Sequence, residues 1–319
     1  MTAYFVPDGF LRRLGELLTT ARGEADRHGF PVLVSATTAI PSIDPAALFG
    51  RLPDGERVLW EQPSQEFSLV GVGVAARLTG CGAQRFTQVS AAWDALRSRS
   101  VVDTPPACPL PGPVGLSGFT FDPARRTDRV WESYPDALLL VPRFLVLSCA
   151  GTTWLMVNIQ VAPGDDTTAV VEGVADEWQN LLLALTNPPA LCAPPFMKGG
   201  QGGFVDGDNV AQAEEWKGTV AAILRDIRAG QVEKVVLARQ VRVRLSRSVD
   251  LEALVRRLRT GYGNCTVFAF ARHGRCFVGA TPERLVRLDG QQVRADCLAG
   301  STARGETEAE DRALGDALL

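Results

Sequence analysis

The short spacing between apolar runs in residues 137–158 restricts the folds that this chain can adopt. The runs Ala137-Leu-Leu-Leu-Val-Pro142, Phe144-Leu-Val-Leu-Ser148 and Thr152-Thr-Trp-Leu-Met-Val-Asn158 are separated only by turn residues. Parallel neighbours need a connection of a dozen or more residues, usually a helix, and there is no room for one here. These strands are therefore predicted to pair antiparallel. With helical patterns elsewhere in the chain, this spacing indicates an α+β protein.

Helices are predicted before and after these runs, where apolar residues recur every three to four positions. Gly29 and Gly230 follow two of them as stop signals. Shorter strands are predicted at residues 31–35, 57–60 and 66–70. The predicted helices cover residues 8–28, 87–97, 165–185, 209–229 and 250–260.

Composition excludes several classes of function. The chain is 46% hydrophobic and 22% charged, with a formal net charge of −3, which is typical of a soluble globular protein and not of a nucleic-acid binder. No apolar run reaches the length of a membrane span, and the start shows no signal peptide. The seven cysteines form no Cys-x-x-Cys pair, so we expect reduced thiols in the cytoplasm. The protein is expected to be a monomer without nucleic-acid or membrane partners.

The segment Gly71-Val-Gly73-Val-Ala-Ala76 matches a dinucleotide-binding pattern after a predicted strand. That pattern requires a helix to begin at the glycines, so that its N-terminus meets a pyrophosphate. Gly80-Cys81-Gly82 would break such a helix within two turns, and no acidic residue ends a strand at the expected distance. A structural strand is the favoured interpretation.

Proline and glycine divide the chain at one place. Residues 188–207 are rich in both and are predicted to form a linker loop. The predicted organisation is therefore an N-terminal α+β portion at residues 1–187, the linker, and a catalytic portion that begins at 208 and continues to 319. The two portions are expected to form one intertwined domain.

The stretch Val232 to Gly305 carries the strongest functional signal. It is predicted to form four strands, at residues 232–239, 266–270, 277–285 and 295–301, and polar residues interrupt three of them. Lys234 shares a strand face with Val236 and Ala238, where an ammonium is disfavoured and a neutral amine can act as a general base. Pro282 places Glu283 at a bulge or strand end, where apolar surroundings would favour a protonated general acid. The spacing alone also allows a non-catalytic interpretation, in which the Lys234 side chain extends to solvent and Pro282-Glu283 forms a turn.

Three motifs of this stretch resemble the chorismate-utilising enzymes, and most of all the isochorismate synthases. The motifs are Lys234-Val-Val-Leu-Ala-Arg239, Gly279-Ala-Thr-Pro-Glu-Arg-Leu285, and Leu298-Ala-Gly-Ser301 with Arg304-Gly305. They occur in the family's order. Earlier segments, including Trp60-Glu61-Gln62-Pro63 and Gly118-Phe-Thr-Phe121-Asp-Pro123, resemble the same family.

The resemblance implies a fold of two large antiparallel sheets that pack face to face, with helices outside. It implies that the substrate is chorismate, that Lys234 activates a water for attack at C2, and that Glu283 protonates the departing C4 hydroxyl. It places Gly300 and Ser301 beside the substrate carboxylate. Related enzymes of the same superfamily carry a lysine at the position of Ala299, where it serves as a covalent nucleophile. Alanine at this position therefore favours a small external nucleophile, such as water or ammonia.

The resemblance also implies Mg²⁺ as a cofactor, which takes oxygen ligands. The family's metal glutamates lie beyond Leu319, so no residue of this chain is assigned to metal, and we expect the C-terminal part of the fold to be lacking. A sibling activity, salicylate or anthranilate synthesis, stays open, as does an inactive fragment or pseudo-enzyme. Whether the product would enter menaquinone or siderophore synthesis is also open.

Overall fold

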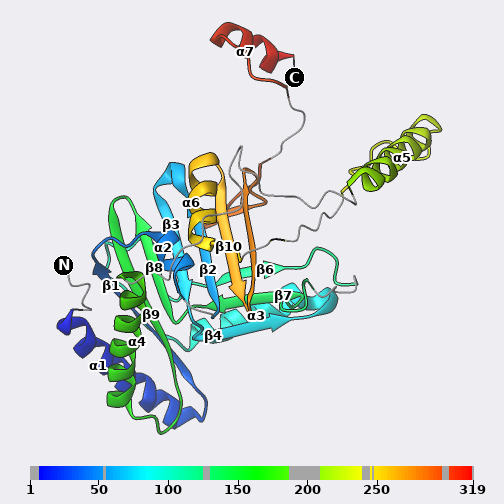
Figure 1. Ribbon diagram of the computed structural model, residues 1–319. Coiled ribbons are helices and arrows are strands. Elements are labelled where there is room, and N and C mark those ends of the chain that lie inside the picture. The colour runs from blue at the N-terminus through cyan, green and yellow to red at the C-terminus, as the bar shows by residue number, and fades with distance from the viewer. Residues whose placement is uncertain are drawn as a thin grey trace.

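An eight-stranded sheet with the strand order β11-β10-β2-β3-β8-β9-β1-β5 forms the centre of the protein (Figure 1). This computed structural model describes residues 7–52, 55–124, 130–186, 209–238, 245, 248–296 and 302–317. All neighbours in the large sheet pair antiparallel except β1 and β5, which are parallel. Its strands are β1 (Val32–Ile40), β2 (Arg57–Gln62), β3 (Phe67–Val72), β5 (Val101–Asp103), β8 (Phe144–Cys149), β9 (Thr152–Val161), β10 (Thr266–Arg272) and β11 (Arg275–Thr281).

Alternation along the central strands divides the core into two layers. In β8, Phe144 and Val146 pack with one hydrophobic cluster, whereas Leu145 and Leu147 pack with another. Successive side chains of a strand point to opposite faces, so a strand that is apolar throughout is covered on both sides. The first face is covered by α1 (Asp8–His28), α2 (Pro45–Gly50), α4 (Thr167–Thr186) and α6 (Leu251–Gly261).

The second face is covered by a three-stranded antiparallel sheet of order β4-β7-β6. Its members are β4 (Ala76–Gly80), β6 (Leu116–Phe119) and β7 (Ala137–Val141). Every residue of β7 is buried, because the large sheet lies on one side and α3 (Arg85–Ser98) packs on the other. The α+β class with helices outside is confirmed, and the second sheet has three strands in the described part of the chain.

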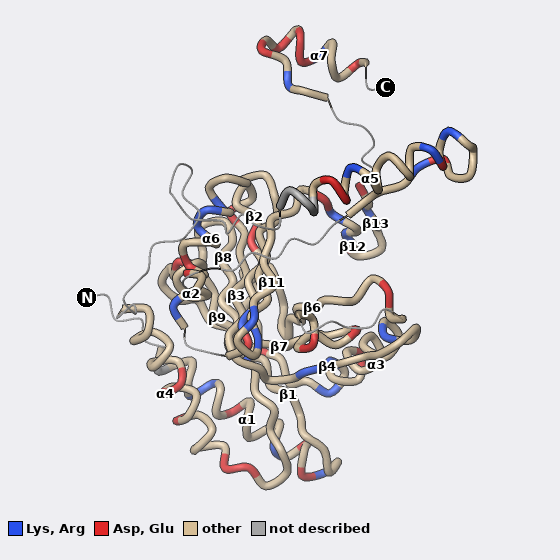
Figure 2. Tube along the Cα trace, turned by 45° about the vertical axis from the view of Figure 1, so that its right-hand side comes forward, with Lys and Arg blue, Asp and Glu red and all other residues tan. Residues whose placement is uncertain are grey.

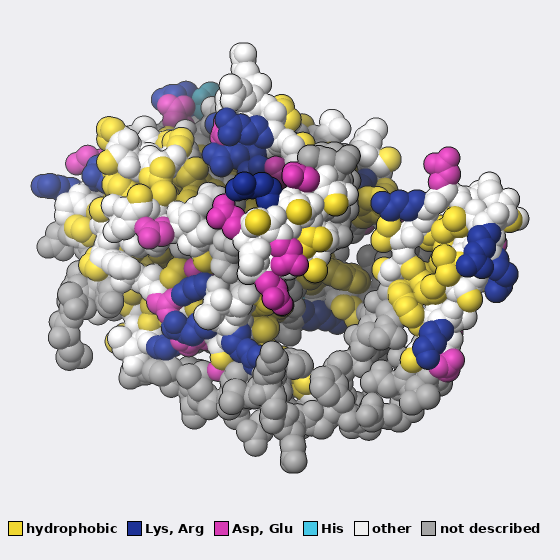
Figure 3. Space-filling view, turned by 90° about the horizontal axis from the view of Figure 1, so that it is seen from above, with side chains coloured by type: hydrophobic (Ala, Val, Ile, Leu, Met, Phe, Trp, Pro, Cys, Tyr) yellow, Lys and Arg dark blue, Asp and Glu magenta, His cyan; other side chains and the backbone are white. Residues whose placement is uncertain are grey.

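The remaining described elements lie apart from these layers. They are α5 (Asn209–Arg228), α7 (Glu308–Asp316) and a hairpin of β12 (Arg287–Asp289) with β13 (Gln292–Arg294). Figure 1 shows α5 and α7 away from the large sheet, and Figure 3 shows hydrophobic side chains gathered over α5, at the right of the view. Val220 and Leu224 of α5 are exposed. No helix in the described ranges has the length and apolarity that a bilayer crossing needs.

Most predicted elements are confirmed, with shifts of a few residues at their ends. Gly29 has φ +72°, a left-handed conformation that favours glycine, and it ends α1 as predicted. The glycines near residue 71 do not open a helix: Gly71 lies within β3, and the chain turns at Gly73 into β4. The dinucleotide pattern is therefore a strand and a turn. The linker at 188–207 lies outside the described residues, and the domain division stays a prediction.

Candidate active site

Lys234 lies in an irregular segment that follows α5. Residues 231–238 are described, and they form neither helix nor strand. The side chains of Lys234 and Val236 are exposed, so the prediction of a strand with an apolar face around Lys234 is wrong for this structure. A strand is stabilised by hydrogen bonds to a neighbour, and no described strand pairs with this segment.

Glu283 lies two residues beyond the end of β11, which ends at Thr281. The prediction of a strand end at Pro282 is thus confirmed, because proline supplies no N–H to a ladder. The Glu283 amide donates a hydrogen bond to Thr281 Oγ1 at 3.1 Å, and this bond holds the turn. The Glu283 side chain is exposed, so the predicted apolar surroundings of its carboxyl are absent from the described structure.

Arg284 connects the turn at Glu283 to the next predicted site segment. Its Nη2 lies 2.7 Å from Asp296 Oδ1, which forms an ion pair between half-exposed side chains. Asp296 immediately precedes residues 297–301, which lie outside the described residues and include Ala299, Gly300 and Ser301. The strand that was predicted at 295–301 is not present at Ala295 and Asp296, the two residues of it that are described.

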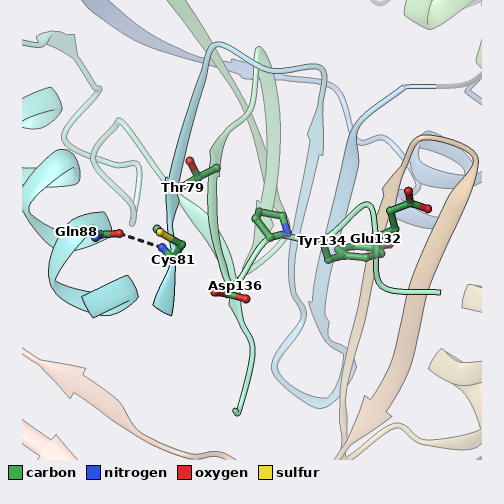
Figure 4. Close-up of a pocket in the computed structure, with 8 residues that line it drawn as sticks. Thr79, Cys81, Gln88, Glu132, Tyr134 and Asp136 are labelled. Atoms are coloured by element: carbon green, nitrogen blue, oxygen red, sulfur yellow. Dashed lines mark hydrogen bonds between the residues drawn. The ribbon is translucent and has the colours of Figure 1, made fainter. Parts of the chain in front are cut away.

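A hollow of about 420 Å³ lies between the three-stranded sheet and residues 132–136. Figure 4 shows Thr79 and Cys81 on one side of it and Tyr134 and Glu132 on the other. Asp136 Oδ2 accepts a hydrogen bond from the Gly82 amide at 2.8 Å, and Gln88 Oε1 accepts one from the Cys81 amide at 2.9 Å. These bonds shape the wall of the hollow.

A second hollow, of about 530 Å³, lies beside β11 and shares Tyr134 with the first. Trp131 stands edge-on to Tyr134 and to Phe277, with ring centroids 5.7 and 5.1 Å apart. The Tyr134 hydroxyl donates to the Phe270 carbonyl at 2.8 Å, and burial raises the pKa of this phenol above its ordinary value. Neither hollow is lined by Lys234 or Glu283.

A cluster of charged side chains joins α6 to α2 and β2, at a place where Figure 2 shows residues of both charges. Arg51 donates two hydrogen bonds to Glu252, and these bonds hold the pKa of that carboxyl below its ordinary value. Burial has the opposite effect on Glu61: it raises the pKa of this carboxyl, and the ion pair with Arg259 at 2.8 Å lowers it less. Asp44 pairs with Arg256 and Arg259.

None of the site residues predicted from the sequence belongs to this charged cluster or lines either hollow. One signal was available for Glu61, because it shares a face of β2 with Leu59, which is fully buried. An acidic residue on the apolar face of a strand is the same pattern that drew attention to Lys234.

The described residues contain no group of three or more His, Cys, Asp or Glu side chains that could hold a metal ion. Glu308, Glu310 and Asp311 open α7, where acidic side chains complement the helix dipole. Asp311 Oδ1 accepts a bond from the Gly305 amide, and Glu308 pairs with Arg312. We therefore assign no described residue to Mg²⁺.

Comparison with known proteins places this geometry in a family. The sequence matches the family described as "Chorismate binding enzyme" over residues 17–319. The salicylate biosynthesis isochorismate synthase of Pseudomonas aeruginosa is 32% identical over 301 residues, 94% of this chain and 60% of that protein. The isochorismate synthase MenF of Bacillus subtilis is 28% identical over 296 residues, 90% of this chain and 60% of that protein.

The fold has a solved counterpart. The structure of MenF, the menaquinone-specific isochorismate synthase from Escherichia coli, aligns with a TM-score of 0.57 and 19% identity, over 95% of this chain and 64% of that chain. The chain thus spans about 60% of the length of the two curated relatives. Because the family match extends over almost the whole sequence, this chain belongs to the family of chorismate-binding enzymes.

Proposed function

We propose that the protein is an isochorismate synthase, which isomerises chorismate to isochorismate. The observation that carries this proposal is the extent of the match: two isochorismate synthases align with 94% and 90% of the chain. The three motifs around Lys234, Glu283 and Ser301 lie within the family match at residues 17–319.

The proposed chemistry needs one base and one acid on opposite faces of the substrate ring. Lys234 Nζ takes a proton from a water, and the water oxygen forms a bond to C2 of chorismate. The ring double bonds shift as the C4–O bond breaks, and Glu283 gives its proton to the departing hydroxyl. One water is added and one is released, so the product is an isomer of the substrate.

The other predicted residues have binding roles in this proposal. The backbone at Gly300 and the hydroxyl of Ser301 hold the substrate carboxylate, and the small side chain of Ala299 leaves room for a water. Arg284 supports the arrangement through its ion pair with Asp296, which links the turn at Glu283 to the segment before Ala299. Magnesium dependence is also part of the proposal, with ligands outside the described residues.

The reaction requires surroundings that exclude solvent from Lys234 and Glu283, both of which are exposed in the described structure. The chain spans about 60% of its curated relatives, so the assay is designed for the chain alone and for the chain with a complementing polypeptide. That polypeptide is the part of the Pseudomonas aeruginosa relative that this chain does not match.

The test incubates the protein with chorismate and Mg²⁺ and separates the products by chromatography. Isochorismate is the expected product, and Lys234→Ala and Glu283→Gln should each reduce turnover by about 100-fold or more. Matched controls are Lys217→Ala and Glu214→Gln on α5, an exposed pair 2.7 Å apart that has no proposed role.

A product other than isochorismate would assign a different activity to the protein. Salicylate, or anthranilate when ammonia is supplied, would indicate a sibling enzyme of the same family. No turnover in either format would favour a protein without catalytic activity. Equal turnover in Lys234→Ala and the unsubstituted protein would remove the base from the proposed mechanism.

A further inference from the structure

Two hydrogen bonds join the hydroxyl of Thr281 to the backbone of Glu283. The Glu283 amide donates to Thr281 Oγ1 at 3.1 Å, and the same hydroxyl donates to the Glu283 carbonyl at 3.4 Å. A threonine hydroxyl that bonds to the backbone two residues later closes a compact turn. One side chain therefore holds both polar groups of the Glu283 backbone.

Thr281 is itself anchored in the large sheet. It is the last residue of β11, and its partner in the ladder is Thr266 of β10, which pairs in turn with β2. Pro282 lies between Thr281 and Glu283, and its ring fixes its own φ and restricts the residue before it to extended conformations. A paired strand, a proline ring and a hydroxyl thus set the position of the Glu283 Cα relative to the sheet.

Arg284 ties down the other side of the same turn. Its Nη2 lies 2.7 Å from Asp296 Oδ1. The β12–β13 hairpin lies between these two residues in the sequence, and its antiparallel pairing brings the chain back toward the turn. Residues 297–301 follow Asp296 directly and lie outside the described residues. The residue after Glu283 is therefore tethered to the segment that leads to the predicted carboxylate-binding loop.

These bonds fix the backbone of Glu283 and leave its carboxyl free. Among the described residues, no hydrogen bond or ion pair engages that carboxyl. A proton donor has to reach the substrate, so a fixed backbone with a free carboxyl suits this task. The bonds lie at the surface and contribute little to stability. Their effect is on geometry, and a displacement of about 1 Å can lower a rate by about 100-fold.

We propose that Thr281 is a positioning residue for Glu283, and that the Arg284–Asp296 ion pair is the second tether of the same turn. This inference rests on the proposed function, in which Glu283 protonates the departing hydroxyl. Thr281 and Arg284 act through the backbone on either side of Glu283. The expected signature is a fall in kcat with little change in KM, because proton transfer is impaired while substrate binding is retained.

The first test removes the hydroxyl and keeps the shape of the side chain. Thr281→Val should lower kcat by about tenfold or more and change KM by less than about twofold. Thr281→Ser keeps the hydroxyl and should retain most of the activity. The matched control is Thr20→Val in α1, which removes an exposed hydroxyl that donates to the Glu16 carbonyl at 3.0 Å and should leave turnover unchanged. Both assay formats of the proposed function are used.

The second test exchanges the charges of the ion pair. Arg284→Asp and Asp296→Arg should each lower kcat by about threefold or more, since each places two like charges side by side. The double variant with both changes re-forms the pair in the opposite sense and should recover most of the loss. Losses that simply add in the double variant would show that this pair is not a tether.

Hydrogen exchange gives a readout that does not depend on turnover. The Glu283 amide should exchange about tenfold faster in Thr281→Val than in the unsubstituted protein, and Thr281→Ser should restore the slow rate. The temperature of unfolding should change by less than about 2 °C in either variant. Activity lost together with a larger fall in this temperature would indicate a structural role and overturn the proposal.

The outcomes separate this inference from the proposed function. If the unsubstituted protein converts no chorismate in either format, the proposed function fails, and the exchange rate of the Glu283 amide alone decides whether Thr281 restrains the turn. If the unsubstituted protein is active and Thr281→Val is equally active, the function stands and the positioning role is wrong. An unchanged exchange rate of the amide in Thr281→Val would also exclude that role.

Discussion

Arg51 and Glu252, which are 201 residues apart in the sequence, form an ion pair with two hydrogen bonds of 2.6 and 2.9 Å. Arg51 caps the C-terminal end of α2, and Glu252 lies in the first turn of α6. The Glu252 carboxylate also accepts a hydrogen bond from Arg256 at 2.8 Å. The pair therefore joins α2 to α6, which are far apart in the sequence, through the Glu252 side chain, which is almost fully buried.

Glu252→Gln should lower the free energy of unfolding by about 3 kcal/mol at pH 7, because Arg51 loses the charge of its partner, whose side chain is almost fully buried. The pKa of Glu252 is lowered from its ordinary value of 4.5, chiefly by the hydrogen bond from Arg51. The charged form thus stabilises the fold above about pH 4.5, and this contribution is lost as the pH falls toward the lowered pKa.

Urea denaturation between pH 7 and pH 3 measures this effect. The difference in unfolding free energy between the unsubstituted protein and Glu252→Gln should shrink as the pH falls below 4.5. The control is Glu308→Gln on α7, an exposed carboxylate paired with Arg312, which should change stability by less than about 0.5 kcal/mol. A difference that stays constant with pH would contradict the role of the charge.

Gly50→Ala should destabilise the protein by about 1–3 kcal/mol, because α2 and α6 touch backbone to backbone at this position. A methyl group at residue 50 would overlap the amide and Cα of Glu252. The matched control is Gly23→Ala in α1, where a methyl group meets no atom within 4 Å and alanine is the better helix former. Thermal unfolding of both variants should give shifts of opposite sign.

Tyr134→Phe should cost about 1 kcal/mol of stability, because the hydrogen bond from the hydroxyl to the Phe270 carbonyl is lost. Burial raises the pKa of Tyr134 above its ordinary value of 10.0, so the neutral phenol stabilises the fold below pH 10 and this contribution is lost as the pH rises above it. Tyr262→Phe is the control, since Tyr262 is 55% exposed. Unfolding measured at pH 8 and pH 10.5 should distinguish the two variants.

Cys276 should resist alkylation in the folded protein. Burial raises the pKa of its thiol to about 11, so only about one thousandth of it is thiolate at pH 8. Cys81 is exposed and should react first. Mass spectrometry after a timed iodoacetamide reaction at pH 8 reports both sites, and equal labelling of the two cysteines would contradict the raised pKa of the half-buried Cys276 thiol.

The local pattern of apolar and turn residues in the sequence determined most of the helices and strands. The apolar period of residues 8–28 and the stop at Gly29 predict α1 closely, and the runs between 137 and 158 predict antiparallel strands because no helix fits between them. The family motifs could be identified from the sequence because the residues of each motif are contiguous in the chain. Strand β5 was not predicted, since its three residues are too few for a periodicity.

Only the tertiary structure decided what surrounds each polar residue. Lys234 and Glu61 present the same signal, a charge among apolar strand residues, yet Glu61 is buried in β2 between two paired strands and Lys234 is exposed in an irregular segment. A strand pattern states which side chains share a face, but burial depends on the neighbours that pair with that strand. Those neighbours come from distant parts of the chain, so the sequence of one segment does not specify them.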